Sequence, residues 1–159
     1  MLRYVDFEKT KKKLERLIKQ TKRVKTKVSL QILLIQLTNG ARISEAYDAY
    51  YQWVKDPSKR EVYVRTRKKK KQDLRLIIIP ESLEPINVKV HIDSVKHCCK
   101  HFLGVNTHSL RYAYITYLGA KHKLPYQIIS KITHHSKPEL VEHYTLKLIA
   151  EEIQRRLIK

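Results

Sequence analysis

Cysteine is scarce in this sequence. The two cysteines, Cys98 and Cys99, are neighbours in the chain, and adjacent cysteines can pair with each other only with strain. A disulfide framework of the kind found in small secreted proteins is therefore not indicated. We expect a protein of a reducing compartment.

Long apolar runs are also absent. No run approaches the ~18 to 20 residues that a membrane-spanning helix needs, and the N-terminus, MLRYVDFEKTKKK, lacks the apolar core of a signal peptide. Internal repeats, low-complexity linkers and an interior domain boundary are missing too. We therefore expect a soluble, intracellular protein without a membrane partner, in which residues 1–159 form a single domain.

Acidic residues are few relative to basic ones. Fifteen Asp plus Glu against 34 Lys plus Arg give a formal net charge of +19, more than solubility requires, so the excess is expected to line a surface that contacts phosphates. Nucleic acid is the predicted partner. Carboxylate clusters are lacking, and His97 with His101 supplies only half of a zinc site. We predict neither a metal nor another cofactor.

Helical periodicity dominates what is present. The expected helices cover residues 6–20, 29–38, 41–53, 91–103, 107–122, 126–135 and 139–159. The segment SLQILLIQLT, with Ser29 as a candidate cap, is apolar on all sides and is predicted to cross the core. Asn39-Gly40 ends this helix, which places Arg42 at a turn between two helices.

Two segments have the composition of strands. REVYVRT (residues 60–66) and DLRLIIIP (residues 73–80) are rich in β-branched residues and flank the basic stretch KKKKQ. They predict an antiparallel hairpin with lysines at its tip. The expected fold class is α+β, mainly helical with a small antiparallel β-sheet.

Several cationic side chains and one nucleophile are candidates for chemistry. His108 and Arg111 are three residues apart at the start of a predicted helix, so both can reach the same phosphate. Arg42 lies at its turn, and His135 precedes Tyr144 by nine residues. Arginines and imidazoles can neutralise the charge on a pentacovalent phosphoryl group without a metal, and a tyrosine can attack that group covalently.

Three segments, NGARISEA, THSLRY and HHSKPELVEHY, resemble in this order the signature boxes of the tyrosine recombinases, the phage integrase family. TNGARISE is similar to the family's T-G-x-R-x-S-E with an additional asparagine, and HSLR matches its H-x-x-R. The nine-residue step from His135 to Tyr144 matches that from the family's third histidine to its nucleophile. The resemblance covers about residues 25–155 and is greatest to the integrases of archaeal viruses.

The third box departs from the family pattern. The family has Gly-His where this chain has His134-His135. The spacing to Tyr144 and the following Ser136 favour His135 as the family's histidine, with His134 as the alternative.

The hairpin also leaves a choice open, because the family places one catalytic lysine where this chain has four in succession. Strand alternation favours Lys68, with Lys70 as the alternative on the same face. Lys69 and Lys71 then face outward and are predicted to bind DNA.

The resemblance implies a site-specific recombinase or integrase that cleaves and rejoins double-stranded DNA through a 3′-phosphotyrosine, inserting a viral or mobile genome in the cytoplasm or nucleoid of a host cell. The residues implied as catalytic are Arg42, Lys68, His108, Arg111, His135 and Tyr144. The family's N-terminal core-binding domain is expected to be absent. A homotetramer on DNA is implied, with a monomer in its absence. Two alternatives remain, a type IB topoisomerase and a basic DNA-binding module without catalysis.

Overall fold

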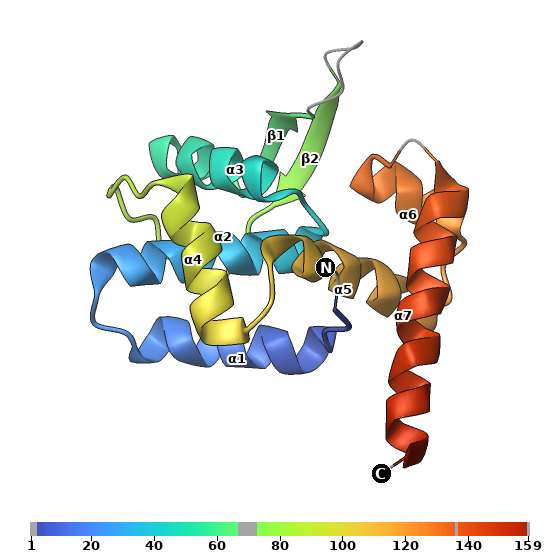
Figure 1. Cartoon of the computed structure of the whole chain (residues 1–159). Helices are drawn as coiled ribbons and strands as arrows, with labels where there is room; N and C mark the ends of the chain where they lie inside the picture. Colours follow the sequence, from blue (N-terminus) through green and yellow to red (C-terminus); the bar gives the residue numbers. More distant parts are fainter. Residues whose placement is uncertain (1–2, 67–72, 136, 159) are drawn as a thin grey trace.

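The structure is a computed structural model that describes residues 3–66, 73–135 and 137–158, with residue 144 described by its backbone alone (Figure 1). Its elements are, in order, α1 (Phe7–Gln20), α2 (Val24–Asn39), α3 (Ile43–Lys55), β1 (Glu61–Arg65), β2 (Leu74–Ile78), α4 (Ile92–Leu103), α5 (Thr107–Ala120), α6 (Tyr126–Thr133) and α7 (Pro138–Ile158). The predicted α+β class, mainly helical with a small antiparallel sheet, is confirmed. None of the described helices is long and apolar enough to cross a membrane.

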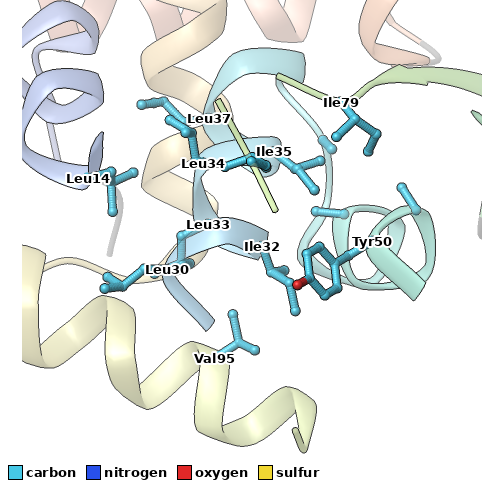
Figure 2. Packing of buried hydrophobic residues seen from close by; sticks show 14 of the residues in the cluster. Leu14, Leu30, Ile32, Leu33, Leu34, Ile35, Leu37, Tyr50, Ile79 and Val95 are labelled. Atoms are coloured by element: carbon cyan, nitrogen blue, oxygen red, sulfur yellow. The ribbon is translucent and has the colours of Figure 1, made fainter. Parts of the chain in front are cut away.

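Helix α2 forms the centre of the larger hydrophobic core, as its continuous apolar sequence predicted. Figure 2 shows its side chains packed against Leu14 of α1, Tyr50 of α3 and Val95 of α4. The labelled core residues of α2 are Leu30, Ile32, Leu33, Leu34, Ile35 and Leu37. Burial on all sides leaves this helix little freedom to shift, so its C-terminal end is a fixed point for the residues that follow.

The start of α2 was predicted wrongly. The helix begins at Val24, with Arg23 at the N-cap position, and Ser29 is a buried residue inside it. The apolar run marks the buried part of the helix, whereas the preceding turn contains Lys25 and Lys27, which are good helix formers and need no burial.

A smaller core joins α5, α6 and α7. It consists of Tyr112, Ile115, Leu118, Ile129, Val141 and Leu148. Helix α5 also contributes Leu110 and Ala113 to the larger core, so opposite faces of one helix connect the two cores. Helix α7 runs along the side of the molecule away from α4 (Figure 1) and leaves Leu157 and Ile158 largely exposed.

The hairpin is fastened to the end of α2. Strands β1 and β2 are antiparallel, and Val62 pairs with Ile77 on the buried face. The Asn39 side chain donates to the Ile78 carbonyl at 2.9 Å and accepts from the Ile78 amide at 2.9 Å. This pair of hydrogen bonds fixes β2 beside the turn that contains Arg42.

Candidate active site

A buried carboxylate gathers three arginines. Glu45, in the first turn of α3, is 1% exposed and accepts from the Arg42 amide at 2.9 Å and from Arg42 Nη1 at 3.2 Å. It also accepts from Arg75 Nη1 at 2.9 Å, and Arg111 Nη1 lies 3.8 Å away. One side chain of α3 therefore brings together groups from the turn before α3, from β2 and from α5.

The C-terminal end of α2 supplies further acceptors. The Gly40 carbonyl accepts from Arg111 Nη1 at 2.9 Å and from Arg75 Nη1 at 3.3 Å, and Arg75 Nη2 donates to the Asn39 carbonyl. Gly40 has φ +59°, and a Cβ there would lie 2.3 Å from the Tyr114 ring. Only glycine fits this turn, which exposes the helix-end carbonyls and their partial negative charge to the guanidinium groups.

The cluster has more positive than negative charge. Arg75 and Arg111 are fully buried, the Arg42 side chain is 31% exposed, and Glu45 is the carboxylate they share. Burial is the main cause that lowers the pKa of Arg111, and Arg42 and Arg75 lower it further, but a guanidinium stays protonated at neutral pH. Because Arg42 reaches solvent, an anion can bind here and compensate the excess charge.

His135 is held as a neutral acceptor. Its Nδ1 lies 2.7 Å from Thr133 Oγ1, and that hydroxyl donates its proton to the Ile129 carbonyl at 2.9 Å. Arg111 Nη2, which can only donate, lies 3.1 Å from Nδ1 and 3.2 Å from Nε2, so a ring nitrogen accepts from the guanidinium. Burial, followed by the charges of Arg111 and Arg42, lowers the pKa of His135 to about 3. The ring is uncharged at neutral pH and can accept a hydrogen bond.

His108 lies at the solvent edge of the same group. Its ring contacts the Tyr112 ring at 5.2 Å between centroids, and Tyr112 contacts the His135 ring at 5.9 Å. Although the residue is exposed, partial burial of the ring lowers its pKa, and the charges of Arg111 and Arg42 lower it further. Both candidate histidines are thus biased toward the neutral form.

The two adjacent histidines point to different partners. His134 Nδ1 lies 2.7 Å from Asp73 Oδ2, which directly precedes β2 at the loop end of the hairpin, whereas His135 contacts Arg111. The structure thus brings His135, and not its neighbour, to the arginines. The catalytic roles of His134 and His135 stay predictions.

Other predicted site residues fall outside this description. Lys68, Lys69, Lys70 and Lys71 lie outside the described residues. Residue 144 belongs to the first two turns of α7, whose backbone is described, but the Tyr144 side chain is not. The roles of these lysines and of Tyr144 therefore stay predictions.

The sequence reasoning missed Glu45 and Arg75 as members of the site. Glu45 closes the first signature box, and its acidic side chain in a strongly basic chain was a usable signal. Arg75 occupies the inward face of β2 together with Ile77. A charged residue in phase with buried residues of a strand requires a buried partner, and the alternation could have revealed it.

The metal-binding half-site of α4 gains no further ligand. His97 and His101 are exposed, and within the described part of the chain no three His, Cys, Asp or Glu side chains converge as a metal site. Cys98 and Cys99 are buried as free thiols, and burial raises their pKa values to about 11 and about 12. Neither thiol is a nucleophile at neutral pH.

Comparison with known proteins identifies two relatives. The chain is 36% identical to a protein of the Acidianus two-tailed virus named "Putative integrase ORF241", over 96% of this chain and 67% of that protein. It is 33% identical to an uncharacterized protein of Methanocaldococcus jannaschii, over 78% of this chain and 70% of that protein. No family model matches the chain, and no solved structure matches it significantly.

Proposed function

The chain belongs to the integrase family represented by the Acidianus two-tailed virus protein, and on this premise we propose that it is a tyrosine recombinase. The observation that carries the proposal is the arginine cluster around Glu45 beside a neutral His135. Such a group of fixed cations is suited to a phosphodiester whose negative charge increases in the transition state. The remaining parts of the proposal are the nucleophile Tyr144 and a hairpin lysine.

The proposed cleavage exchanges one ester bond for another. Tyr144 Oη attacks the scissile phosphorus, so an Oη–P bond forms as the bond from phosphorus to the 5′-oxygen breaks. A neutral imidazole, His135 or His108, accepts the tyrosine proton, and Lys68, or alternatively Lys70, protonates the leaving oxygen. The 3′-phosphotyrosine is then attacked by the 5′-hydroxyl of another strand, which restores the tyrosine and joins the DNA without an external energy source.

The arginines have different proposed tasks. Arg42 reaches solvent and can donate directly to a non-bridging oxygen. Arg111 is fully buried, with donors directed at the Gly40 and Thr133 carbonyls and at His135. We propose that its buried charge stabilises the phosphoryl group without a direct hydrogen bond.

The test is covalent capture on DNA. End-labelled nicked duplexes with a randomised central sequence are incubated with the protein, and a protein–DNA adduct is sought on a denaturing gel. The wild-type protein and Tyr63→Phe, a control at an exposed strand tyrosine, should both form the adduct, whereas Tyr144→Phe should bind DNA without forming it. Adduct formation by Tyr144→Phe would transfer the role to another tyrosine, first to Tyr112, Tyr114 or Tyr117.

Further outcomes separate the related functions. Adduct formation should persist in EDTA. Sequencing of the captured DNA should show a preferred site, and a tetramer should assemble on paired duplexes. Relaxation of supercoiled plasmid without a preferred site would indicate a type IB topoisomerase, and DNA binding with no adduct would indicate a module without catalysis.

A further inference from the structure

The backbone of His134 has a conformation that glycine adopts more easily. The residue follows the last turn of α6 with φ +59° and ψ +38°, and its amide donates to the Ser130 carbonyl. A side chain in this left-handed region is strained, although histidine is tolerated there more often than most residues. A residue that keeps a side chain at this conformational cost is a candidate for a specific role.

The His134 ring makes a contact across the molecule. Its Nδ1 lies 2.7 Å from Asp73 Oδ2, which is 61 residues away in the chain. Asp73 is itself fixed, because its carbonyl accepts from the Thr66 amide at 2.9 Å and from Thr66 Oγ1 at 3.2 Å. Thr66 and Asp73 close the described end of the hairpin, so the His134 ring joins the turn before α7 directly to the hairpin.

This contact borders the candidate active site. A cavity of about 530 Å³ is lined by Asp73, His134 and His135 together with Ser130, Lys131 and Pro138. On one side of it His135 contacts Arg111, and on the other Asp73 precedes β2. Arg75 and Asn39 already fix the strands to the arginine cluster, and the His134–Asp73 contact joins the loop end of these strands to the turn that bears His135.

We propose that His134 and Asp73 are positioning residues for DNA cleavage, and that their contact holds the loop end of the hairpin strands, at Thr66 and Asp73, in place beside His135. The inference rests on the proposed function. The side chains are 21% and 43% exposed, and a pair so accessible to water contributes little to stability. The strained backbone of His134 reduces even that small contribution to stability. The role that accounts for the pair is therefore to orient the hairpin relative to His135.

The first test compares rates of adduct formation on nicked duplexes. His134→Gly removes the ring and relieves the backbone, and Asp73→Ala removes the carboxylate. Each should slow adduct formation by about tenfold or more, since small misplacements of reacting groups are costly. The double variant should be no slower than either single variant, because both remove the same contact. Melting temperatures should change by no more than about 2 °C.

A matched control is the exposed pair of His91 and Asp93 at the start of α4, with Nδ1 to Oδ2 at 3.4 Å. Asp93→Ala removes a similar contact far from the arginines and should leave the rate unchanged.

A second substrate tests whether the His134–Asp73 contact acts through the hairpin lysine or through the turn that bears His135. When sulfur replaces the bridging 5′-oxygen, the leaving group departs as a thiolate and needs no proton from a hairpin lysine. On this substrate the His134 and Asp73 variants should cleave at nearly the wild-type rate, if the pair acts through the hairpin. Slow cleavage without rescue would overturn the inference and assign the pair to the turn that bears His135.

Failure of the inference is distinguishable from failure of the proposed function. Wild-type rates of adduct formation in His134→Gly and Asp73→Ala would overturn the positioning role alone. Absence of an adduct with the wild-type protein would overturn the recombinase proposal and this inference with it.

Discussion

The two hydrophobic cores of this molecule hold different parts of the candidate site. The larger core, around α2, fixes the helix end and the strand that position Arg42, Arg75 and Glu45. The smaller core joins α5, α6 and α7, the elements next to His135 and residue 144. The groups that stabilise charge are therefore built on the better packed region, and the proposed nucleophile is on the region with less buried apolar surface.

Helix α5 connects these regions. Leu110 and Ala113 belong to the larger core, whereas Tyr112 and Ile115 belong to the smaller one. Arg111, between them, contacts Gly40 on one side and His135 on the other. Local stability follows the amount of buried apolar contact, so we expect α7 to open more readily than α2 and the arginines to stay fixed when it does.

The largest expected effect is on catalysis within the better packed region. Arg42→Ala should slow adduct formation by about 100-fold or more, as for the loss of one preorganised donor. Arg42 is partly exposed, so its removal should hardly change the urea midpoint. Arg111→Ala should show a similar rate loss and also a lower midpoint, because it leaves a buried carboxylate and carbonyls with fewer donors. Equal midpoints for the two variants would contradict the buried placement of Arg111.

The next effect compares the two cores directly. Leu33→Ala, in the fully buried α2, should lower the free energy of unfolding by about 3 kcal/mol, and Leu148→Ala, at the edge of the smaller core, by about 1 to 2 kcal/mol, because a site near the surface can relax around the deletion. Urea unfolding measures both values. In Leu148→Ala, backbone amide hydrogen exchange should become faster mainly in α7. Equally faster exchange in all helices would show that the two cores unfold as one unit.

A smaller effect concerns the pH dependence of stability. The pKa of His135 is about 3 in the folded protein and about 6.5 in the unfolded chain. Below pH 6.5 the unfolded state binds a proton that the folded state does not, so the free energy of unfolding falls as the pH decreases, by about 1 kcal/mol per pH unit. His135→Gln should remove this part of the slope between pH 6.5 and 5. An unchanged slope would show that the histidine is not held neutral.

The smallest effect is expected at the end of α7. Leu157 is 82% exposed, so Leu157→Ala should change the free energy of unfolding by less than about 0.5 kcal/mol. A loss above about 1 kcal/mol, or one that depends on protein concentration, would show that this residue packs against another chain.

Periodicity and composition predicted most of the fold. The apolar run of α2, the β-branched strands and the helical stripes are local features, and each reports which face of an element is buried. The order and spacing of three short boxes likewise selected Arg42, His108, Arg111 and His135, and the structure places these residues together. Their catalytic roles, and those of Tyr144 and the hairpin lysines, await the experiments above.

The tertiary structure alone decided which residues that are far apart in the chain make contact. The pairing of Glu45 with Arg75, of Gly40 with Arg111 and of Asp73 with His134 spans 30, 71 and 61 residues. No local pattern specifies such pairs, because they depend on how the hairpin and α5 pack at the end of α2. The sequence by itself determined which groups are available and which faces are buried. Packing decided which of the two adjacent histidines contacts the arginines. The backbone turn after α6 directs the His135 ring toward Arg111 and the His134 ring toward Asp73.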